Sequence, residues 1–273
     1  MGWDKQDRVR HPLVTIATPP VLAIAHGSRD PRAAATTADL LDGVRRRATQ
    51  QGLPGLKIAT AYLGHAAPSP TQALSALHGA GARQIIALPL LLTDAYHSKT
   101  DIPTVLRAAQ ATVPGLQILY ASPLGPHPLL ITAMERRLAE AGIHSGDPHT
   151  AVVLAAAGSS DPAASAAIAQ LARAWQALRG WHSVIPAFAS AASPTPAQAV
   201  ATLRESGAPR IAVASYLLAP GLFADKVRDT SLAAGASTVS GVLGAAPGLA
   251  ELVLRRYATA SAGLLRQREA RIA

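Results

Sequence analysis

Cysteine is absent from the 273-residue chain. This absence excludes disulfides, thiolate zinc sites, iron–sulfur clusters and cysteine nucleophiles. Any metal ion must therefore be bound by histidine, by carboxylate or by the substrate itself.

Long apolar runs are also lacking. The run Ile85–Leu92 is among the longest, and it is far shorter than the ~20 residues that cross a bilayer. The first residues, MGWDKQDRVRHPLV, are charged and contain no apolar signal region. We therefore expect a cytoplasmic protein with no membrane partner.

Lysine and aromatic residues are sparse. Only Lys5, Lys57, Lys99 and Lys226 contribute lysines to the 25 basic residues, and aromatics make up 4% of the chain. The net charge of +9 fits a nucleic acid, an acidic lipid or a substrate with several carboxylates, and it also fits arginine-rich codon usage alone. Nucleic-acid binders usually interleave aromatics with basic runs, and the notable basic run here is Arg45–Arg47. We expect no nucleic-acid partner.

Several catalytic motifs are missing too. The sequence has no GxSxG, P-loop, HExxH or GxGxxG pattern. These absences weigh against a serine hydrolase, an NTPase, a zincin and a dinucleotide-dependent dehydrogenase.

What the chain does contain is an internal repeat. AHGSRDPRAAATTADL (25–40) returns as AAGSSDPAASAAIAQL (156–171), segment 61–74 returns at 187–200, and segment 81–103 returns at 207–229. The length also favours two domains of ~130 residues. We predict an N-terminal extension (1–19), a first domain (20–145) and a second domain that repeats it in degenerate form (146–273).

Each copy alternates short apolar runs with Ala- and Leu-rich stretches of helix-forming composition. In the first copy we expect strands at Val21–Ala25, Leu56–Leu63, Ile85–Leu92 and Leu116–Ala121, and helices at Arg32–Gln50, Pro70–Ala80, Pro103–Ala111 and Pro128–Ala141. In the second copy we expect strands at Ala151–Ala156, Val184–Ala189, Ile211–Leu217 and Thr238–Leu243. Continuous apolar strands alternating with helices are typical of buried parallel sheets. The predicted fold is α/β: two similar domains, each a parallel sheet flanked by helices, with a cleft between them.

The first strand–helix junction predicts where ligands bind. Asp30 is a candidate N-cap with Pro31 at the first helical position, and Asp161–Pro162 repeats this pattern. Gly27 and Ser28 form the tight loop before the helix, and the backbone N–H groups of such a loop favour anions. Ligands of open α/β sheets bind beyond the carboxyl ends of the strands.

Comparison of the copies separates fold from chemistry, since residues found in only one copy are candidates for the site. His26 corresponds to Ala157, and His97 corresponds to Phe223. Both histidines follow strands of the first copy, so we predict that His26 and His97 share a catalytic and metal-handling site. Neutral imidazoles bind borderline divalent metals or act as general bases, although a lone histidine is more often structural.

A third histidine lies at the end of the second strand. His65 aligns with Ala191 and is a candidate third metal ligand, with a plain loop histidine as the alternative. Asp101, close to His97, is a candidate helix cap.

These residues carry a family resemblance. AHGSRDPRA, followed about 70 residues later by an apolar strand, a histidine and DIP (LPLLLTDAYHSKTDIP), resembles the CbiX/SirB-type sirohydrochlorin chelatases in their duplicated long form. The resemblance covers about residues 20–245. It implies a class II chelatase fold and ATP-independent insertion of Co²⁺, Fe²⁺ or, as in some relatives, Ni²⁺ into sirohydrochlorin, in siroheme or cobalamin biosynthesis. It also implies that His26 and His97 are the active-site pair and that the metal is a substrate, with no permanently bound cofactor.

Sirohydrochlorin carries acetate and propionate groups, so a basic site suits it. We expect Gly27, Ser28, Arg29 and Lys99 to bind this substrate. One segment departs from the family: where relatives often read FLELAEPS, this chain reads YLGHAAPS, so Gly64 and Ala67 replace acidic residues. We hypothesise that His65 takes over their role.

Two other readings stay open. A tetrapyrrole or metal carrier would share the histidines but not accelerate insertion, and the missing carboxylate favours it. A basic nucleic-acid-binding module would leave the histidine asymmetry unexplained. For the assembly, we expect a monomer or a homodimer.

Overall fold

The computed structural model describes residues 18–94 and 97–272, with side chains up to Gly263 except that of His97. The first repeat contains β1 (Val21–Ala25), α1 (Pro31–Gln50), β2 (Ile58–Tyr62), α2 (Pro70–Gly79), β3 (Gln84–Pro89), the π-helical turn η1 (His97–Asp101), α3 (Ile102–Thr112), β4 (Gln117–Tyr120) and α4 (Pro128–Glu140). The second contains β5 (Thr150–Ala156), α5 (Pro162–Arg179), β6 (Ser183–Phe188), α6 (Pro196–Glu205), β7 (Arg210–Tyr216), α7 (Leu222–Ala233), β8 (Thr238–Val239) and α8 (Pro247–Ile272).

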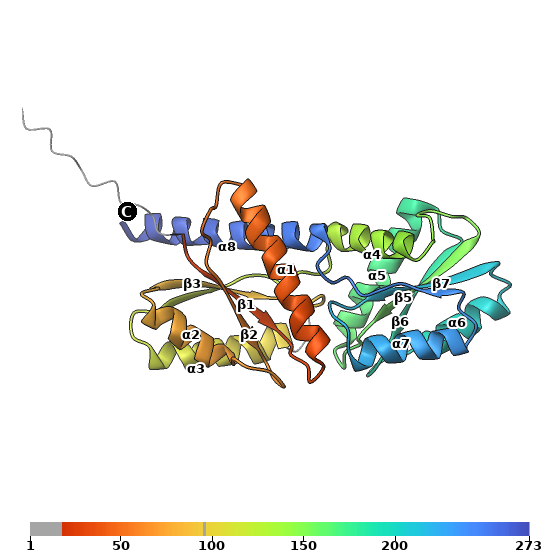
Figure 1. Ribbon diagram of the computed structural model, residues 1–273, viewed down its shortest axis with the longest axis horizontal. Coiled ribbons are helices and arrows are strands. Elements are labelled where there is room, and N and C mark those ends of the chain that lie inside the picture. Colours follow the sequence, from red (N-terminus) through yellow and green to blue (C-terminus); the bar gives the residue numbers. More distant parts are fainter. Residues whose placement is uncertain (1–17, 95–96, 273) are drawn as a thin grey trace, which may run out of the picture.

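The strands form two parallel sheets of the same topology. The first has the order β2-β1-β3-β4 and the second the order β6-β5-β7-β8 (Figure 1). The predicted α/β fold of two similar domains, each a parallel sheet with helices on both faces, is confirmed. None of the helices in the described ranges combines the length and apolar composition that a membrane span needs.

The central strands explain the layers. Every residue of β1 and of β5 is buried. Alternate side chains of a strand point to opposite faces. Leu22 and Ile24 accordingly join the core under α2 and α3, while Val21 and Ala23 join the core on the other face. A continuous apolar strand is therefore the signature of a sheet covered on both sides.

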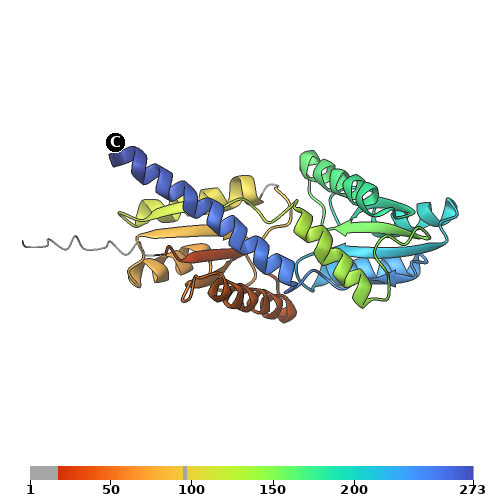
Figure 2. The same cartoon turned by 90° about the horizontal axis from the view of Figure 1, so that it is seen from above.

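The last helix of each repeat covers the sheet of the other repeat. Helix α8 packs against α1, β3 and β4 of the first sheet, and α4 packs against β7 of the second sheet. Figure 2 shows α8 running along the first sheet, with α4 beside the second. The predicted domain limits separate the two sheets in sequence, but in space each sheet carries a helix from the other repeat.

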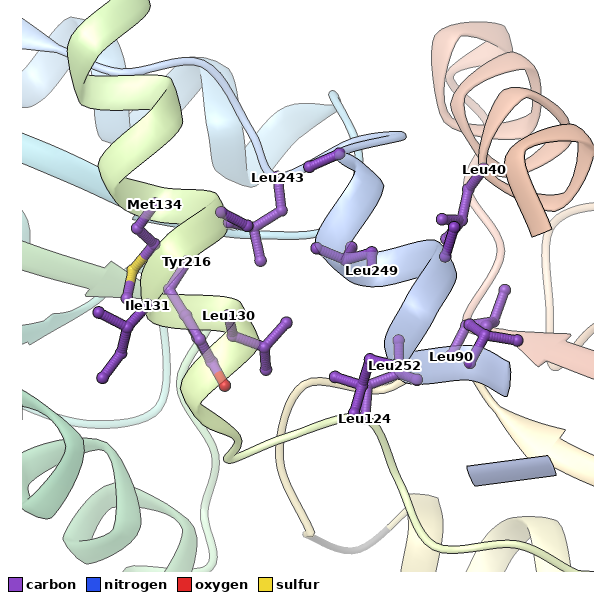
Figure 3. Close-up of a cluster of buried hydrophobic side chains, with 14 of the residues drawn as sticks. Leu40, Leu90, Leu124, Leu130, Ile131, Met134, Tyr216, Leu243, Leu249 and Leu252 are labelled. Atoms are coloured by element: carbon purple, nitrogen blue, oxygen red, sulfur yellow. The ribbon is translucent and has the colours of Figure 1, made fainter. Parts of the chain in front are cut away.

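This exchange joins the two repeats through one core. Leu249 and Leu252 of α8 lie between Leu40 of α1 and Leu130 of α4, all nearly or fully buried (Figure 3). Tyr216, at the end of β7, donates a hydrogen bond from its hydroxyl across the repeats to the carbonyl oxygen of Leu92, at 2.9 Å. Shared apolar burial on this scale makes the two repeats one packing unit.

The crossing of α4 and α8 is reciprocal. Arg137 of α4 donates from Nη2 to the carbonyl oxygen of Leu243 at 3.0 Å. Arg256 of α8 donates in the same way to the carbonyl oxygen of Leu124 at 3.1 Å. The segments LGPHPLLITAMERR and LGAAPGLAELVLRR align these arginines with each other and these leucines with each other. The two helices therefore cross about a pseudo-two-fold axis.

Three predicted strands need correction. The strand expected at Thr238–Leu243 ends at Val239, because the hydroxyl and carbonyl groups of Ser240 bond to Ser215 instead of continuing the ladder. Strands β2 and β4 differ from the continuous buried strands that the apolar pattern predicts, because they lie at the edges of their sheet and are only partly buried.

Candidate active site

The candidate site lies where the chain changes direction across the first sheet. From β1 the chain passes through α1 to β2 on one side, and then through α2 to β3 on the other side. His26 directly follows β1, and His97 opens η1 after β3. The two residues therefore flank the topological switch point, where open α/β sheets bind their ligands.

His26 is exposed at the end of the central strand. Its Nδ1 lies 3.1 Å from the carbonyl oxygen of Gly27, so the tautomer with a proton on Nδ1 fits this geometry. In that tautomer Nε2 carries the lone pair, which is the group that accepts a proton or binds a metal ion.

His97 is the first residue of η1, and its imidazole lies outside the described side chains. The turn that carries it is anchored on both sides. Ser98 donates from its hydroxyl to Asp94 at 2.8 Å, and the hydroxyl of Tyr120 donates to the carbonyl oxygen of Ser98 at 2.8 Å. Burial and the nearby Asp94 charge raise the pKa of Tyr120, which keeps its hydroxyl a donor. The pairing of His97 with His26 stays a prediction.

His65 lies beside the same junction. The N–H of the preceding residue, Gly64, donates to the carbonyl oxygen of His26 at 3.1 Å. His65 is exposed and has a left-handed backbone with φ of 62°. Its counterpart Ala191 has φ of 57°, so the backbone shape does not require histidine. The side chain is available for another use, and its role as a metal ligand stays a prediction.

Gly27 holds this arrangement together. It has φ of +89°, and a Cβ at this position would overlap the carbonyl oxygen of Gly64. Gly158 has φ of +93° and meets the carbonyl oxygen of Ser190 in the same way. Only glycine fits this close approach of two loops. Because both repeats share the geometry, the structure gives Gly27 a role in the fold.

Ser28 has an equally local role. Its Oγ accepts a hydrogen bond from the N–H of Asp30 at 3.0 Å, and Ser159 accepts one from Asp161 at 3.0 Å. Both aspartates cap their helices as predicted, Asp30 through the N–H of Arg32. The serines therefore build the turn in both repeats, and substrate binding by Ser28 stays a prediction.

Two ion pairs connect the repeats around this site. Lys99 Nζ lies 3.1 Å from Asp161 Oδ2, at the start of α5. Arg32 Nη2 lies 2.6 Å from Asp225 Oδ2, in the first turn of α7. Arg29, also predicted to bind substrate, is exposed. Basic groups do gather here, but Lys99 and Arg32 hold carboxylates of the other repeat.

The carboxylates respond to these cations. A hydrogen bond from Lys99 holds the pKa of Asp161 below its usual range, and one from Arg32 does the same for the pKa of Asp30. Both acids therefore stay ionised at neutral pH, and their cationic partners stay paired.

Sequence reasoning missed Arg32, Asp161 and Asp225 as contacts between the repeats, although a signal was present. Lys99 aligns with Asp225, and Arg32 aligns with Ala163. The repeats thus differ in charge at both positions. The same comparison that singles out the histidines marks Lys99, Asp225 and Arg32. It does not mark Asp161, because Asp161 aligns with another aspartate, Asp30.

Two further findings bear on the site. Asp101 stands at the N-cap position of α3 but makes no capping hydrogen bond with its side chain, because the π-helical turn before it continues directly into the helix. In the described part of the chain, no three histidine, aspartate or glutamate side chains cluster closely enough to hold a metal ion.

The internal repeat also appears in the comparison with known proteins. The CbiX family model matches twice, at residues 20–141 and 151–260. Two curated proteins of Priestia megaterium are similar: a sirohydrochlorin cobaltochelatase, 25% identical over 77% of this chain and 67% of its own, and a sirohydrochlorin ferrochelatase, 25% identical over 77% and 76%. Among solved structures, SirB from Bacillus subtilis with Fe³⁺ matches with a TM-score of 0.78 and 25% identity, covering 92% of this chain and 98% of its own.

Proposed function

This chain belongs to the CbiX family, and from this membership we propose that it inserts a divalent metal ion into sirohydrochlorin without ATP. Co²⁺ and Fe²⁺ are the expected substrates, with Ni²⁺ a third candidate. The observation that carries the proposal is the placement of His26 and His97 at the switch point of the first sheet. The second repeat has Ala157 and Phe223 at the corresponding positions. The relatives named for cobalt and for iron are equally similar, so the choice of metal is left to experiment.

The chemistry assigns a task to each histidine. Metallation strips water from the metal ion and removes the pyrrole N–H protons of the ring. Nε2 of His26 accepts a proton or presents the metal ion, since Nδ1 is turned to the carbonyl of Gly27. His97 supplies the second imidazole from the other side of the switch point, and His65 takes the place of the family carboxylate.

The substrate's carboxylates need cationic partners. Arg29 is exposed, follows His26 by three residues in the sequence and is our first candidate, together with the Gly27–Ser28 loop between them. Lys99 contributes if a substrate carboxylate replaces Asp161 on its ammonium group. The reaction is proposed to take place in the cytoplasm, with no permanently bound cofactor, in a monomer or a homodimer.

A spectrophotometric metallation assay tests this function. Sirohydrochlorin is mixed with Co²⁺, Fe²⁺ or Ni²⁺, with and without protein. We expect conversion above the protein-free rate, reduced at least about 100-fold in His26→Ala and His97→Ala, and reduced in His65→Ala with altered metal dependence. Wild-type rates in the first two variants would refute the site, and an unchanged His65→Ala would remove His65 from it. Ring binding without acceleration would favour a tetrapyrrole carrier.

A further inference from the structure

Two adjacent apolar side chains are exposed at the start of α7. Leu222 is 79% exposed and Phe223 is 43% exposed, although most large apolar side chains of the described residues are buried. Neighbouring exposed apolar residues gain little for folding and often mark a binding surface. We call this pair the α7 apolar pair.

The pair lies against the junction that carries His26. Just before it, the backbone of Gly221 lies close to Ser28, because a Cβ added to Gly221 would be 3.7 Å from Ser28 Oγ. Just after it, Asp225 is bonded to Arg32 at 2.6 Å. The five-residue segment that contains the pair therefore approaches the β1–α1 junction at both ends and is bonded to it at Asp225, and Figure 1 shows the start of α7 beside the start of α1.

The repeat adds an independent observation. Phe223 occupies the position of His97, so the second repeat has an aromatic ring where the first has its second histidine. The pseudo-two-fold relation brings the β7–α7 loop to the β1–α1 loop, and the β3–η1 segment to the start of α5 through Lys99 and Asp161. The second repeat thus presents an apolar surface at a site whose chemistry belongs to the first.

We propose that Leu222 and Phe223 form the apolar surface that contacts one face of the tetrapyrrole ring and presents it to His26. The inference rests on the proposed function and assigns the second repeat a part in substrate binding. A tetrapyrrole suits the position because its flat conjugated core buries apolar area on aliphatic and aromatic side chains. Its carboxylates find a cation in the exposed Arg29 of the same β1–α1 loop, so that the apolar groups of the site match the ring and the cationic group matches its rim.

Titration of the full-length protein with metal-free sirohydrochlorin tests the pair. Ring binding is followed by the change in ring absorbance, and KM for the ring is measured with the metal at saturation. We expect Leu222→Ala and Phe223→Ala each to raise Kd and KM for the ring about tenfold, with the KM for the metal unchanged. Phe223→Tyr keeps an aromatic face and is expected to bind within about twofold of the wild type.

Leu232→Ala is the matched control, because Leu232 lies on the same helix, is 46% exposed, and is about 15 Å further along the helix axis than Leu222. It is expected to bind the ring as the wild type does. Unchanged Kd and KM in both α7 variants, with a wild type that binds and metallates the ring, would overturn this inference and leave the proposed function standing. A wild type that does not bind the ring would overturn both. If the molecular mass of the wild type in solution rises with protein concentration and is lower in the two α7 variants, the pair forms a contact between copies of the chain. That result would also overturn the inference.

Discussion

At the scale of single residues, the repeats divide positions into two kinds. Gly27 and Gly158 keep the same backbone angle and the same close approach, so this position serves the fold. His26 and Ala157 stand on the same scaffold with different chemistry. Identity between the repeats marks what the turn needs, and difference marks what the site needs.

Gly27→Ala is expected to lower the free energy of unfolding by roughly 2–4 kcal/mol, because a Cβ combines left-handed strain with overlap on Gly64. Urea denaturation followed by circular dichroism measures it. The control is Gly52→Ala, since Gly52 has φ of +80° but nothing within 4 Å of its Cβ position. It is expected to cost only about 1 kcal/mol. Equal losses in the two variants would show that the contact with Gly64 contributes nothing.

The position of a site residue could be predicted where it depends on one strand alone. An apolar run followed by His26 places that residue at the end of β1, and β1 matches its predicted range. The ion pair of Lys99 with Asp161 was not predictable, because it joins residues 62 positions apart through the packing of two repeats. For this reason Lys99 was assigned to the substrate alone.

At the scale of elements, one residue at the start of α5 both caps the helix and contacts the other repeat. Asp161 accepts from the N–H of Ala163 as the N-cap and binds Lys99 of the first repeat. One carboxylate therefore stabilises a helix terminus and a contact between sheets, and both uses depend on its charge.

Replacing Lys99 is expected to raise the pKa of Asp161 part of the way to its usual value of 3.8. Because the folded-state pKa is depressed, the stabilisation is complete above the unfolded-state pKa and is lost as the pH falls through the folded-state pKa. Below about pH 4, the free energy of unfolding should therefore fall less steeply with decreasing pH in Lys99→Met than in the wild type. NMR titration of the Asp161 carboxyl group measures the shift. Lys226→Met is the control, since Lys226 binds the carbonyl oxygen of Ala189. An unmoved Asp161 pKa in Lys99→Met would show that the pair does not persist in solution.

The helices themselves were more predictable than their partners. The expected helices Pro70–Ala80 and Pro128–Ala141 agree with α2 and α4 to within a residue. Nothing in an amphipathic pattern says which of two similar sheets a helix covers, since both sheets offer the same apolar face. The exchange of α4 and α8 is decided by the chain path between repeats, and it becomes visible only in the structure.

At the scale of the whole molecule, that exchange predicts the behaviour of a half-chain. A fragment of residues 18–145 would lack α8 over β3 and would leave α4 without the second sheet. We expect it not to persist as a folded monomer, but to expose apolar surface or to associate. Light scattering and dye binding measure both effects. Adding residues 146–273 as a separate chain should restore a folded 1:1 complex, whereas a monomeric fragment that unfolds cooperatively would contradict the prediction.

The reciprocal cover also constrains how this gene can change over generations. Ala157 and Phe223 stand where the first half has histidines, and the two sheets keep the same topology, so the scaffold does not need histidine at these positions. Deletion of that half is a different event, since it would strip β3 and β4 of their cover in one step. Selection for the first half's chemistry therefore preserves the second half as well, although that half has no counterpart of His26 or His97.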